Sequence, residues 1–204
     1  MHIAVTGNIG AGKTTLTTML SKHYGWEAQF EDVDHNPYLE DFYADMSQWS
    51  FALQIYFLGS RFRQVKEIRD SGKNIIQDRT IYEDAHIFAE NLNDMKLLTD
   101  RDFANYTSVF NLMKSFVSAP DLLIYLKSDV PNLVKKIYKR GRDYESSISI
   151  EYLSKLNLKY ENWISNYQEG KLLIIEVDDL DFVDRPEDFG LILERIETEM
   201  HGLF

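Results

Sequence analysis

Short apolar runs alternate along the chain with longer stretches in which apolar residues recur at helical spacing. The short runs have the length of strands and lie at residues 2–6, 26–31, 74–77, 121–126 and 172–177. The helical patterns cover residues 12–24, 47–70, 81–92, 100–118, 129–140, 150–167 and a last segment from 186. Strands that alternate with helices favour a parallel sheet, because the crossover helices pack on both of its faces. The pattern therefore predicts an α/β fold with a five-stranded parallel sheet.

Turn and capping residues support these boundaries. Gly25 and Gly72 each follow a predicted helix, where a residue in the left-handed conformation commonly ends it. Pro131 stands in the first turn of another helix, a position that needs no backbone N–H group. No internal repeat, low-complexity linker or composition break divides the chain. We expect a single domain over residues 1–204.

Composition narrows the classes of partner. The 204 residues include 22 Lys and Arg and 33 Asp and Glu, which gives a formal charge of −11. Surfaces that bind nucleic acid normally carry an excess of positive charge, so we expect no nucleic-acid partner. The chain has no cysteine, which excludes disulfides and thiolate chemistry. The first strand pattern begins at residue 2 and no apolar run reaches the length of a membrane span. We therefore expect a cytoplasmic protein without a signal peptide or a membrane partner.

The turn after the first predicted strand carries a phosphate-binding motif. Eight residues fit G-x-x-x-x-G-K-[ST], namely Gly7, Asn8, Ile9, Gly10, Ala11, Gly12, Lys13 and Thr14. Glycines let such a loop wrap around phosphate groups, so that backbone N–H groups and the positive end of the next helix face the oxygens. Lys13 can reach the β- and γ-phosphates, and the Thr14 hydroxyl can ligate Mg²⁺. A glycine-rich turn can match by chance, but the flanking strand and helix are the context that the motif requires.

Three uses of this loop compete: a small-molecule kinase, a GTPase, and a motor or DNA-processing ATPase. A guanine-specific GTPase needs N-K-x-D, and no Asn of this chain is followed by Lys. A motor ATPase usually has an apolar strand that ends in adjacent acids, and the nearest match, residues 173–176, lies late in the chain. Five basic residues instead cluster near the end of one helix, at Lys135, Lys136, Lys139, Arg140 and Arg142. The alternative for this cluster is a solvated helix end, but beside a phosphate loop it favours the basic lid of a kinase.

Further motifs follow the loop in a fixed order. They are Glu31-x-Val33, the helix segment 49–54, Asp78-Arg79-Thr80, the segment 140–145, and Glu151-Tyr152-Leu153-x-x-Leu156. With these motifs the chain resembles, nearly end to end, the deoxyribonucleoside kinases, which include deoxycytidine, deoxyguanosine and deoxyadenosine kinases. It looks most like their bacterial purine-preferring members. The resemblance implies a P-loop kinase fold with a lid at about 139–149, and the use of ATP and Mg²⁺.

The resemblance also implies roles in phosphoryl transfer. Glu31 would accept the proton of a nucleoside 5′-hydroxyl, and Arg79 and Lys13 would stabilise charge on the migrating phosphoryl group. Asp78, where many relatives carry Glu, would join Thr14 as a Mg²⁺ ligand. The alternatives are an ordinary exposed carboxylate at Glu31 and a surface ion pair between Asp78 and Arg79.

One departure from the family pattern follows Glu31. Asp32 stands where the family usually has Pro, and its like charge would raise the pKa of Glu31. The remaining ATP contacts that the resemblance implies lie in the lid and after the last strand, at Lys136, Arg140, Arg142, Asp181 and Phe182.

The nucleoside site implied by the resemblance combines polar and apolar residues. Tyr43 and Glu145 match contacts to the sugar 3′-hydroxyl, which would leave little room at the 2′ position and favour deoxyribose. Gln54 matches the residue that pairs with the base edge, with one donor and one acceptor group. Arg61 and Asp84 match a charged pair at the far side of the base pocket. The apolar part of the implied wall comprises Ile9, Val33, Leu53, Phe57 and Phe88.

Arg61 and Asp84 bear on the base, because thymidine-preferring relatives have smaller or apolar residues at these two positions. The two charged residues therefore point to deoxyadenosine, deoxyguanosine or deoxycytidine. The run Asn36-Pro37-Tyr38-Leu39 and the short chain look most like the bacterial purine-preferring members, so we expect deoxyadenosine, with deoxyguanosine and deoxycytidine as alternatives. Alternatively, Arg61 and Asp84 form a buried salt bridge that serves the structure alone. Family members are homodimers packed through helices, and the apolar stretches 49–62 and 100–117 would supply that surface.

Two other activities stay open at this point. A nucleoside monophosphate kinase would need additional cations for the phosphate of its acceptor, whereas Tyr43, Gln54 and Glu145 suit an uncharged sugar and base. A nucleotide-sensing protein without turnover would also bind ATP, but Glu31→Gln would leave its activity intact. The histidines have no metal-ligand spacing, and we assign them no role.

Overall fold

The computed structural model describes residues 1–31, 35–142, 145 and 148–202. Within them, one sheet of five parallel strands has the order β2-β3-β1-β4-β5. The strands are β1 (His2–Thr6), β2 (Glu27–Gln29), β3 (Ile75–Asp78), β4 (Leu122–Lys127) and β5 (Lys171–Glu176). The expected sheet is confirmed, and the glycine-rich loop directly follows its central strand.

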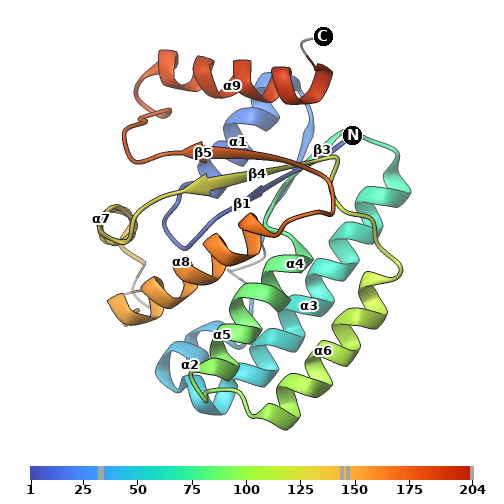
Figure 1. The fold of residues 1–204 in the computed structure, drawn as a ribbon, viewed down its shortest axis with the longest axis vertical. Coiled ribbons are helices and arrows are strands. Elements are labelled where there is room, and N and C mark those ends of the chain that lie inside the picture. The colour runs from blue at the N-terminus through green and yellow to red at the C-terminus, as the bar shows by residue number, and fades with distance from the viewer. Residues whose placement is uncertain (32–34, 143–144, 146–147, 203–204) are drawn as a thin grey trace.

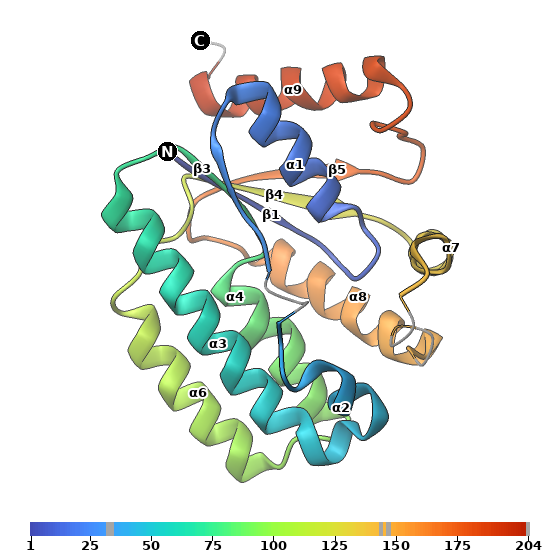
Figure 2. The same ribbon diagram turned by 180° about the vertical axis from the view of Figure 1, so that it is seen from behind.

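Helices cover both faces of this sheet (Figure 1). One face is covered by α1 (Lys13–Tyr24) and α9 (Pro186–His201). The other carries a thicker layer that includes α3 (Met46–Ser71), α4 (Ile81–Glu83), α6 (Asp100–Lys114) and α8 (Ile150–Ser165). Figure 2 shows the same layers from behind, with α2 (Leu39–Ala44) beside the beginning of α3 and α7 (Val130–Arg140) at the edge of the molecule.

The helical segment expected over residues 81–92 is present, but its middle is a π-helix. It begins with α4, widens into η1 (Asp84–Ala89) and continues as α5 (Glu90–Asp94). A π-helix has more residues in each turn than an α-helix, and such segments frequently occur at functional sites. Asp84 and Phe88 lie in η1, and both line the cavity described below.

Three features differ from the sequence expectation. β2 is shorter than the strand expected over 26–31, because it pairs only with β3 and its last pair is Gln29 with Gln77. The chain then leaves the sheet, which frees Phe30 and Glu31 to line the cavity. α2 is too short for its periodicity to be recognised in the sequence. The helices expected over 100–118 and 150–167 end early, at Lys114 and Ser165.

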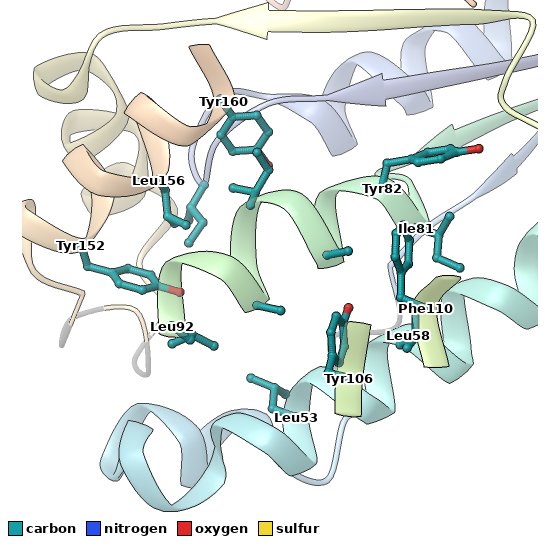
Figure 3. Close-up of a cluster of buried hydrophobic side chains, with 14 of the residues drawn as sticks. Leu53, Leu58, Ile81, Tyr82, Leu92, Tyr106, Phe110, Tyr152, Leu156 and Tyr160 are labelled. Atoms are coloured by element: carbon teal, nitrogen blue, oxygen red, sulfur yellow. The ribbon is translucent and has the colours of Figure 1, made fainter. Parts of the chain in front are cut away.

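Two apolar layers hold the sheet between its helices. Ile3 and Val5 of β1 belong to the layer under α1 and α9, whereas Ala4 faces the opposite side, as the alternation of side chains along a strand requires. Figure 3 shows the larger layer, where α3, α4, α6 and α8 meet, with side chains that include Leu53, Ile81, Tyr106 and Leu156. Every helix in the described part of the chain is too short or too polar to cross a bilayer.

Candidate active site

A cavity of about 360 Å³ lies at the carboxyl ends of β1, β2 and β3. Parallel strands bring these ends to one edge of the sheet, which is where α/β proteins bind their ligands. The structure brings together sixteen of the expected site residues in its lining, namely Ile9, Gly10, Lys13, Thr14, Glu31, Tyr43, Leu53, Gln54, Phe57, Asp78, Arg79, Asp84, Phe88, Arg140, Arg142 and Glu145.

The glycine-rich loop turns tightly between β1 and α1. Gly7, with a φ of 147°, and Gly10, with a φ of 87°, adopt conformations that L side chains rarely take. A Cβ atom at Gly7 would lie 2.8 Å from the carbonyl oxygen of Leu126, and one at Gly10 would lie 2.8 Å from that of Leu133. Both positions therefore require glycine, because the loop packs closely against β4 and α7.

Asn8 and Lys13 hold the loop in place. The Asn8 side chain accepts a hydrogen bond from the backbone N–H of Ile9 at 2.8 Å and donates one to the carbonyl oxygen of Leu153 at 3.1 Å. Lys13 Nζ donates to the carbonyl oxygen of Asn8 at 2.9 Å. Burial, reinforced by the nearby charge of Arg79, lowers the pKa of Lys13 to about 7. A bound triphosphate would favour the charged form of this side chain.

Thr14 and Asp78 meet beside the loop although they are far apart in the sequence. The Thr14 hydroxyl donates to Asp78 Oδ2 at 2.5 Å, and the other carboxylate oxygen, Oδ1, is buried without a partner among the described residues. A hydroxyl beside a carboxylate with a vacant oxygen fits Mg²⁺, which prefers oxygen ligands and keeps several waters. No group of three or more His, Asp or Glu residues in the described ranges is arranged to hold a metal ion. The pair therefore fits an ion whose other ligands are phosphate oxygens and water.

Glu31 lies between two arginines. Its Oε1 accepts a hydrogen bond from Arg61 Nη2 at 2.9 Å, and its Oε2 accepts one from Arg79 Nε at 3.1 Å. Burial alone would raise the pKa of Glu31, but Arg79, Arg61 and Lys13 together hold it below its ordinary value. The cations therefore outweigh burial, and the effect expected from Asp32 on this pKa stays a prediction. Asp32, on which that expectation was based, lies outside the described residues.

Arg79 is fixed from several sides. It is only 5% exposed, and its backbone has a φ of 71°, in the left-handed region. Its Nη1 donates to Tyr160 Oη at 2.8 Å and to Glu83 Oε1 at 3.0 Å. The guanidinium carbon lies 4.9 Å from the centroid of the Phe88 ring. The charge of Arg79 is thus held at the cavity wall between Glu31 and Glu83.

Arg61 lies behind the cavity wall and is 2% exposed. Besides Glu31, it contacts Asp84, with 3.4 Å between Nε and Oδ2, and donates from Nη1 to the carbonyl oxygen of Asp78 at 3.0 Å. Asp84 itself lines the cavity, and burial raises its pKa to about 7 despite the opposing charge of Arg61. The expected charged pair is present, and it is Asp84 that reaches the ligand space.

Most of the remaining lining is apolar or aromatic. Tyr43 comes from α2, and Gln54 and Phe57 come from α3. Gln54 is 3% exposed, and its Oε1 has no hydrogen-bond partner within the described residues. Buried amide oxygens are normally paired, so this one is a vacant acceptor at the cavity wall. Val33, also expected at this wall, lies outside the described residues.

Glu145 pairs with both expected lid arginines. Arg140 donates to its two oxygens, from Nε at 3.0 Å and from Nη2 at 2.5 Å, and Arg142 Nη1 lies 3.6 Å from Oε1. The Glu145 side chain is 5% exposed, whereas those of the arginines are 35% and 37% exposed. The carboxylate expected at the sugar and the cations expected at the phosphates thus neutralise one another in this structure. Residues 143, 144, 146 and 147 of the expected lid lie outside the described ranges.

The residues expected beside the adenine lie outside the cavity lining. Phe182 packs against the loop, because a Cβ atom at Gly12 would lie 3.2 Å from its ring. Burial lowers the pKa of Lys136, while Asp178 and Asp181 oppose this shift, so the two carboxylates lie near its ammonium group. None of these residues lines the cavity described above.

Several residues at the cavity were not singled out from the sequence. Four further side chains line it, namely Phe30, Leu39, Phe42 and Tyr152. Glu83 and Tyr160 support Arg79 from behind. A signal existed for Glu83, because Thr80 and Glu83 have the spacing of a capping box. Tyr160 has only the helical spacing of a core residue, and its role depends on the tertiary structure.

Known proteins resemble the chain over nearly its whole length. A model of the deoxynucleoside kinase family matches residues 3–201. The chain is 41% identical over 201 residues to a deoxyadenosine/deoxycytidine kinase of Bacillus subtilis, which covers 98% of this chain and 93% of the relative. It is 40% identical over 193 residues to a deoxyadenosine kinase of Dictyostelium discoideum, and this match covers 95% of the chain and 78% of the relative. A structure of deoxyadenosine kinase from M. mycoides with the products dCMP and a flexible dCDP bound matches with a TM-score of 0.87 and 33% identity, covering 97% of this chain and 100% of that one.

Proposed function

Because the chain belongs to the deoxynucleoside kinase family, we propose that deoxyadenosine is the preferred acceptor in its ATP-dependent phosphorylation of deoxynucleosides. Deoxycytidine is the second substrate that we expect. The name of the Bacillus subtilis relative, which includes both nucleosides, supports these two as substrates.

The observation that carries the base preference is the vacant acceptor of Gln54, which lines the cavity. The exocyclic amino groups of adenine and cytosine donate hydrogen bonds, whereas O6 of guanine and O4 of thymine accept them. A glutamine amide pairs with adenine through two hydrogen bonds, accepting with its oxygen and donating with its nitrogen. A carboxyl oxygen of Asp84, which also lines the cavity, is a further acceptor for an amino group.

We propose Glu31 as the base that accepts the proton of the 5′-hydroxyl. Its lowered pKa keeps the carboxylate ionised at neutral pH. In a loose phosphoryl-transfer transition state the nucleophile forms little bond to phosphorus, so its proton can leave late and a weak base is sufficient. Arg79 and Lys13 stabilise the charge on the migrating phosphoryl group, and both line the cavity with Glu31.

Donor binding is proposed to involve three groups of residues around the glycine-rich loop. Thr14 and Asp78 would hold Mg²⁺, which when bound neutralises charge on the β- and γ-phosphates. Arg140 and Arg142 would turn from Glu145 to these phosphates, and Glu145 would then contact the sugar 3′-hydroxyl together with Tyr43. The adenine of ATP would lie near Lys136, Asp181 and Phe182.

The proposed active protein is a cytoplasmic homodimer. The absence of cysteine from the sequence fits a reducing compartment, and ATP is a cytoplasmic substrate. Two large apolar side chains support the dimer: Leu112 of α6 is 63% exposed and Phe116, just after it, is 61% exposed. The other stretch expected to form the interface, residues 49–62, contributes no large exposed hydrophobic residue in the described structure.

A transfer assay with ATP and Mg²⁺ tests the proposed preference. Deoxyadenosine, deoxycytidine, deoxyguanosine and thymidine are compared by kcat/KM, with the four deoxynucleoside monophosphates in parallel. We expect deoxyadenosine first and deoxycytidine second, and little turnover of thymidine or of any monophosphate. A first rank for deoxyguanosine would overturn the base preference, and turnover confined to monophosphates would overturn the proposed acceptor.

A further inference from the structure

We propose that Glu83 and Tyr160 position Arg79 for phosphoryl transfer, which rests on the role proposed above for Arg79. Neither residue lines the cavity, and both are fully buried, with 0% of their surface exposed. They come from different elements, Glu83 from the end of α4 and Tyr160 from α8, so that only the tertiary structure joins them. Figure 3 shows Tyr160 projecting from α8 toward the helical segment that begins with α4.

The backbone of Arg79 requires support. Its φ of 71° lies in the left-handed region, which is unfavourable for a residue other than glycine. Such conformations persist where the surroundings over-determine them, and they cluster at active sites. Glu83 Oε2 accepts a hydrogen bond from the backbone N–H of Thr80 at 2.9 Å. This contact fixes the peptide unit that directly follows Arg79.

The same carboxylate also fixes the guanidinium group. Glu83 Oε1 accepts from Arg79 Nη1 at 3.0 Å and from the Tyr160 hydroxyl at 2.7 Å. The Tyr160 oxygen in turn accepts from Nη1 at 2.8 Å, which closes a triangle of three hydrogen-bonded groups. Burial, followed by the charge of Glu83, raises the pKa of Tyr160 well above its ordinary value, so its hydroxyl keeps its proton and remains a donor.

This arrangement does more than cap a helix. A capping role uses Oε2 alone, whereas Oε1 is devoted to Arg79 and Tyr160. Because Nη1 is held from behind, Nε is directed to Glu31 at 3.1 Å, and Arg79 lines the cavity. Glu83 and Tyr160 are therefore positioning residues that act through Arg79. Electrostatic catalysis depends on such preorganisation, since the group then needs no rearrangement as charge develops.

Tyr160→Phe tests this role with little change in packing. It removes one hydroxyl and keeps the ring that stacks on Tyr125, with 5.8 Å between the centroids. Tyr125→Phe is the matched control, because the Tyr125 hydroxyl bonds to Glu161 and has no contact with Arg79. We expect Tyr160→Phe to lower kcat roughly tenfold, the loss of a hydrogen bond to a charged group, with the KM values for ATP and deoxyadenosine nearly unchanged. Tyr125→Phe should keep the wild-type kcat.

The dependence on Arg79 is tested in a double-mutant cycle. Tyr160→Phe should cause no further loss of kcat in an Arg79→Ala background, because the group that it positions is absent. Glu83→Gln, which faces Nη1 with a neutral amide, should lower kcat in the same manner as Tyr160→Phe. A wild-type kcat for Tyr160→Phe, or an equal loss with and without Arg79, would overturn the positioning role.

Binding of deoxyadenosine 5′-monophosphate separates this inference from the proposed function. If the wild-type protein phosphorylates no deoxynucleoside, the proposed function is overturned. The affinity for this monophosphate, measured by calorimetry, still tests whether Arg79 is positioned at a phosphate. We expect roughly tenfold weaker binding for Tyr160→Phe and wild-type affinity for Tyr125→Phe. Equal affinity in the two variants would overturn the inference even in an active enzyme.

Discussion

Glu31 and Asp84 both contact Arg61, yet their pKa values shift in opposite directions. Burial favours the neutral form of each carboxyl group. Glu31 has a second arginine, Arg79, at 3.1 Å and a lowered pKa. Asp84 has its ion pair with Arg61 at the longer distance of 3.4 Å, the like charges of Glu31 and Glu83 raise its pKa further, and that pKa is about 7. The balance of nearby cations and carboxylates thus decides how far each carboxyl group is ionised at neutral pH. This leaves Glu31 suited to accept a proton.

Asp84→Asn should change the pH dependence of stability. The pKa of Asp84 is about 7 in the folded protein and 3.8 in its ordinary state. A raised folded pKa means that the folded protein holds the proton more tightly, so this contribution to stability is full below pH 3.8 and is lost as the pH rises to 7. Asn does not titrate, so the variant does not lose this stability as the pH rises. The difference in the free energy of unfolding between the variant and the wild type should therefore shift in favour of the variant by about 2 kcal/mol between pH 5 and pH 8.

Urea unfolding at both pH values measures this difference. Asp94→Asn is the control, because Asp94 is exposed on α5 and pairs with Lys159 at the surface. Its stability should follow that of the wild type at both pH values. Parallel curves for wild type and Asp84→Asn would contradict the raised pKa of Asp84.

At the scale of elements, the segment expected to act as a lid contains a competing ion pair. Arg140 is the last residue of α7 and Arg142 lies just beyond it, and both contact the carboxylate of Glu145. A triphosphate offers the arginines stronger, bidentate partners, and their departure would leave Glu145 available to the sugar. Donor and acceptor binding should therefore be coupled through this one carboxylate, with the same factor in both directions.

Glu145→Gln tests the coupling. In the wild type, a non-hydrolysable ATP analogue should tighten deoxyadenosine binding by about fivefold or more. In the variant the arginines are no longer held by a carboxylate, so the affinity ratio with and without the analogue should fall close to one. Calorimetric titrations in both orders measure that ratio. Glu151→Gln, which alters an exposed i,i+4 pair with Lys155 on α8, should retain the wild-type ratio, and the same ratio in Glu145→Gln would refute the coupling.

At the scale of the whole molecule, charge and apolar surface point to different contacts. The chain carries a formal charge of −11, yet its cavity gathers Lys13, Arg79, Arg140 and Arg142. The same lining also holds the carboxyl groups of Glu31, Asp78, Asp84 and Glu145, so the cavity concentrates charge of both signs. Four converging cations on an acidic molecule suit a small anionic ligand better than a polyanion. The exposed apolar side chains at the end of α6 lie outside this cavity lining and suit a contact between proteins.

The double substitution Leu112→Glu and Phe116→Glu should convert the proposed dimer to a monomer. Buried glutamates at the centre of an interface would lose hydration without a partner charge. Light scattering coupled to size exclusion should give twice the chain mass of 23.9 kDa for the wild type and that mass for the variant. Leu158→Glu, an equally exposed leucine on α8, should stay dimeric. A monomeric wild type, or a variant that remains dimeric, would exclude this surface as the interface.

The sequence by itself determined the sheet, most of the helices and the phosphate loop. These features depend on short stretches of sequence. Hydrophobic periodicity and capping residues mark the helices and strands, and the glycines at 7 and 10 mark the tight turn of the loop. The resemblance to a family added most of the residues that line the cavity. It did not give the pairing of Glu145 with the lid arginines or the position of Arg61 behind the wall.

Only the tertiary structure decided the electrostatics of the site. The lowered pKa of Glu31 depends on Arg61 and Arg79, which lie 30 and 48 residues away in the sequence. Tyr160 reaches Arg79 across 81 residues, and nothing in the local pattern of α8 distinguishes it from a core tyrosine. Buried charges interact over a few ångströms in a medium of low polarity, so their ionisation follows from distances and burial that only the folded chain defines.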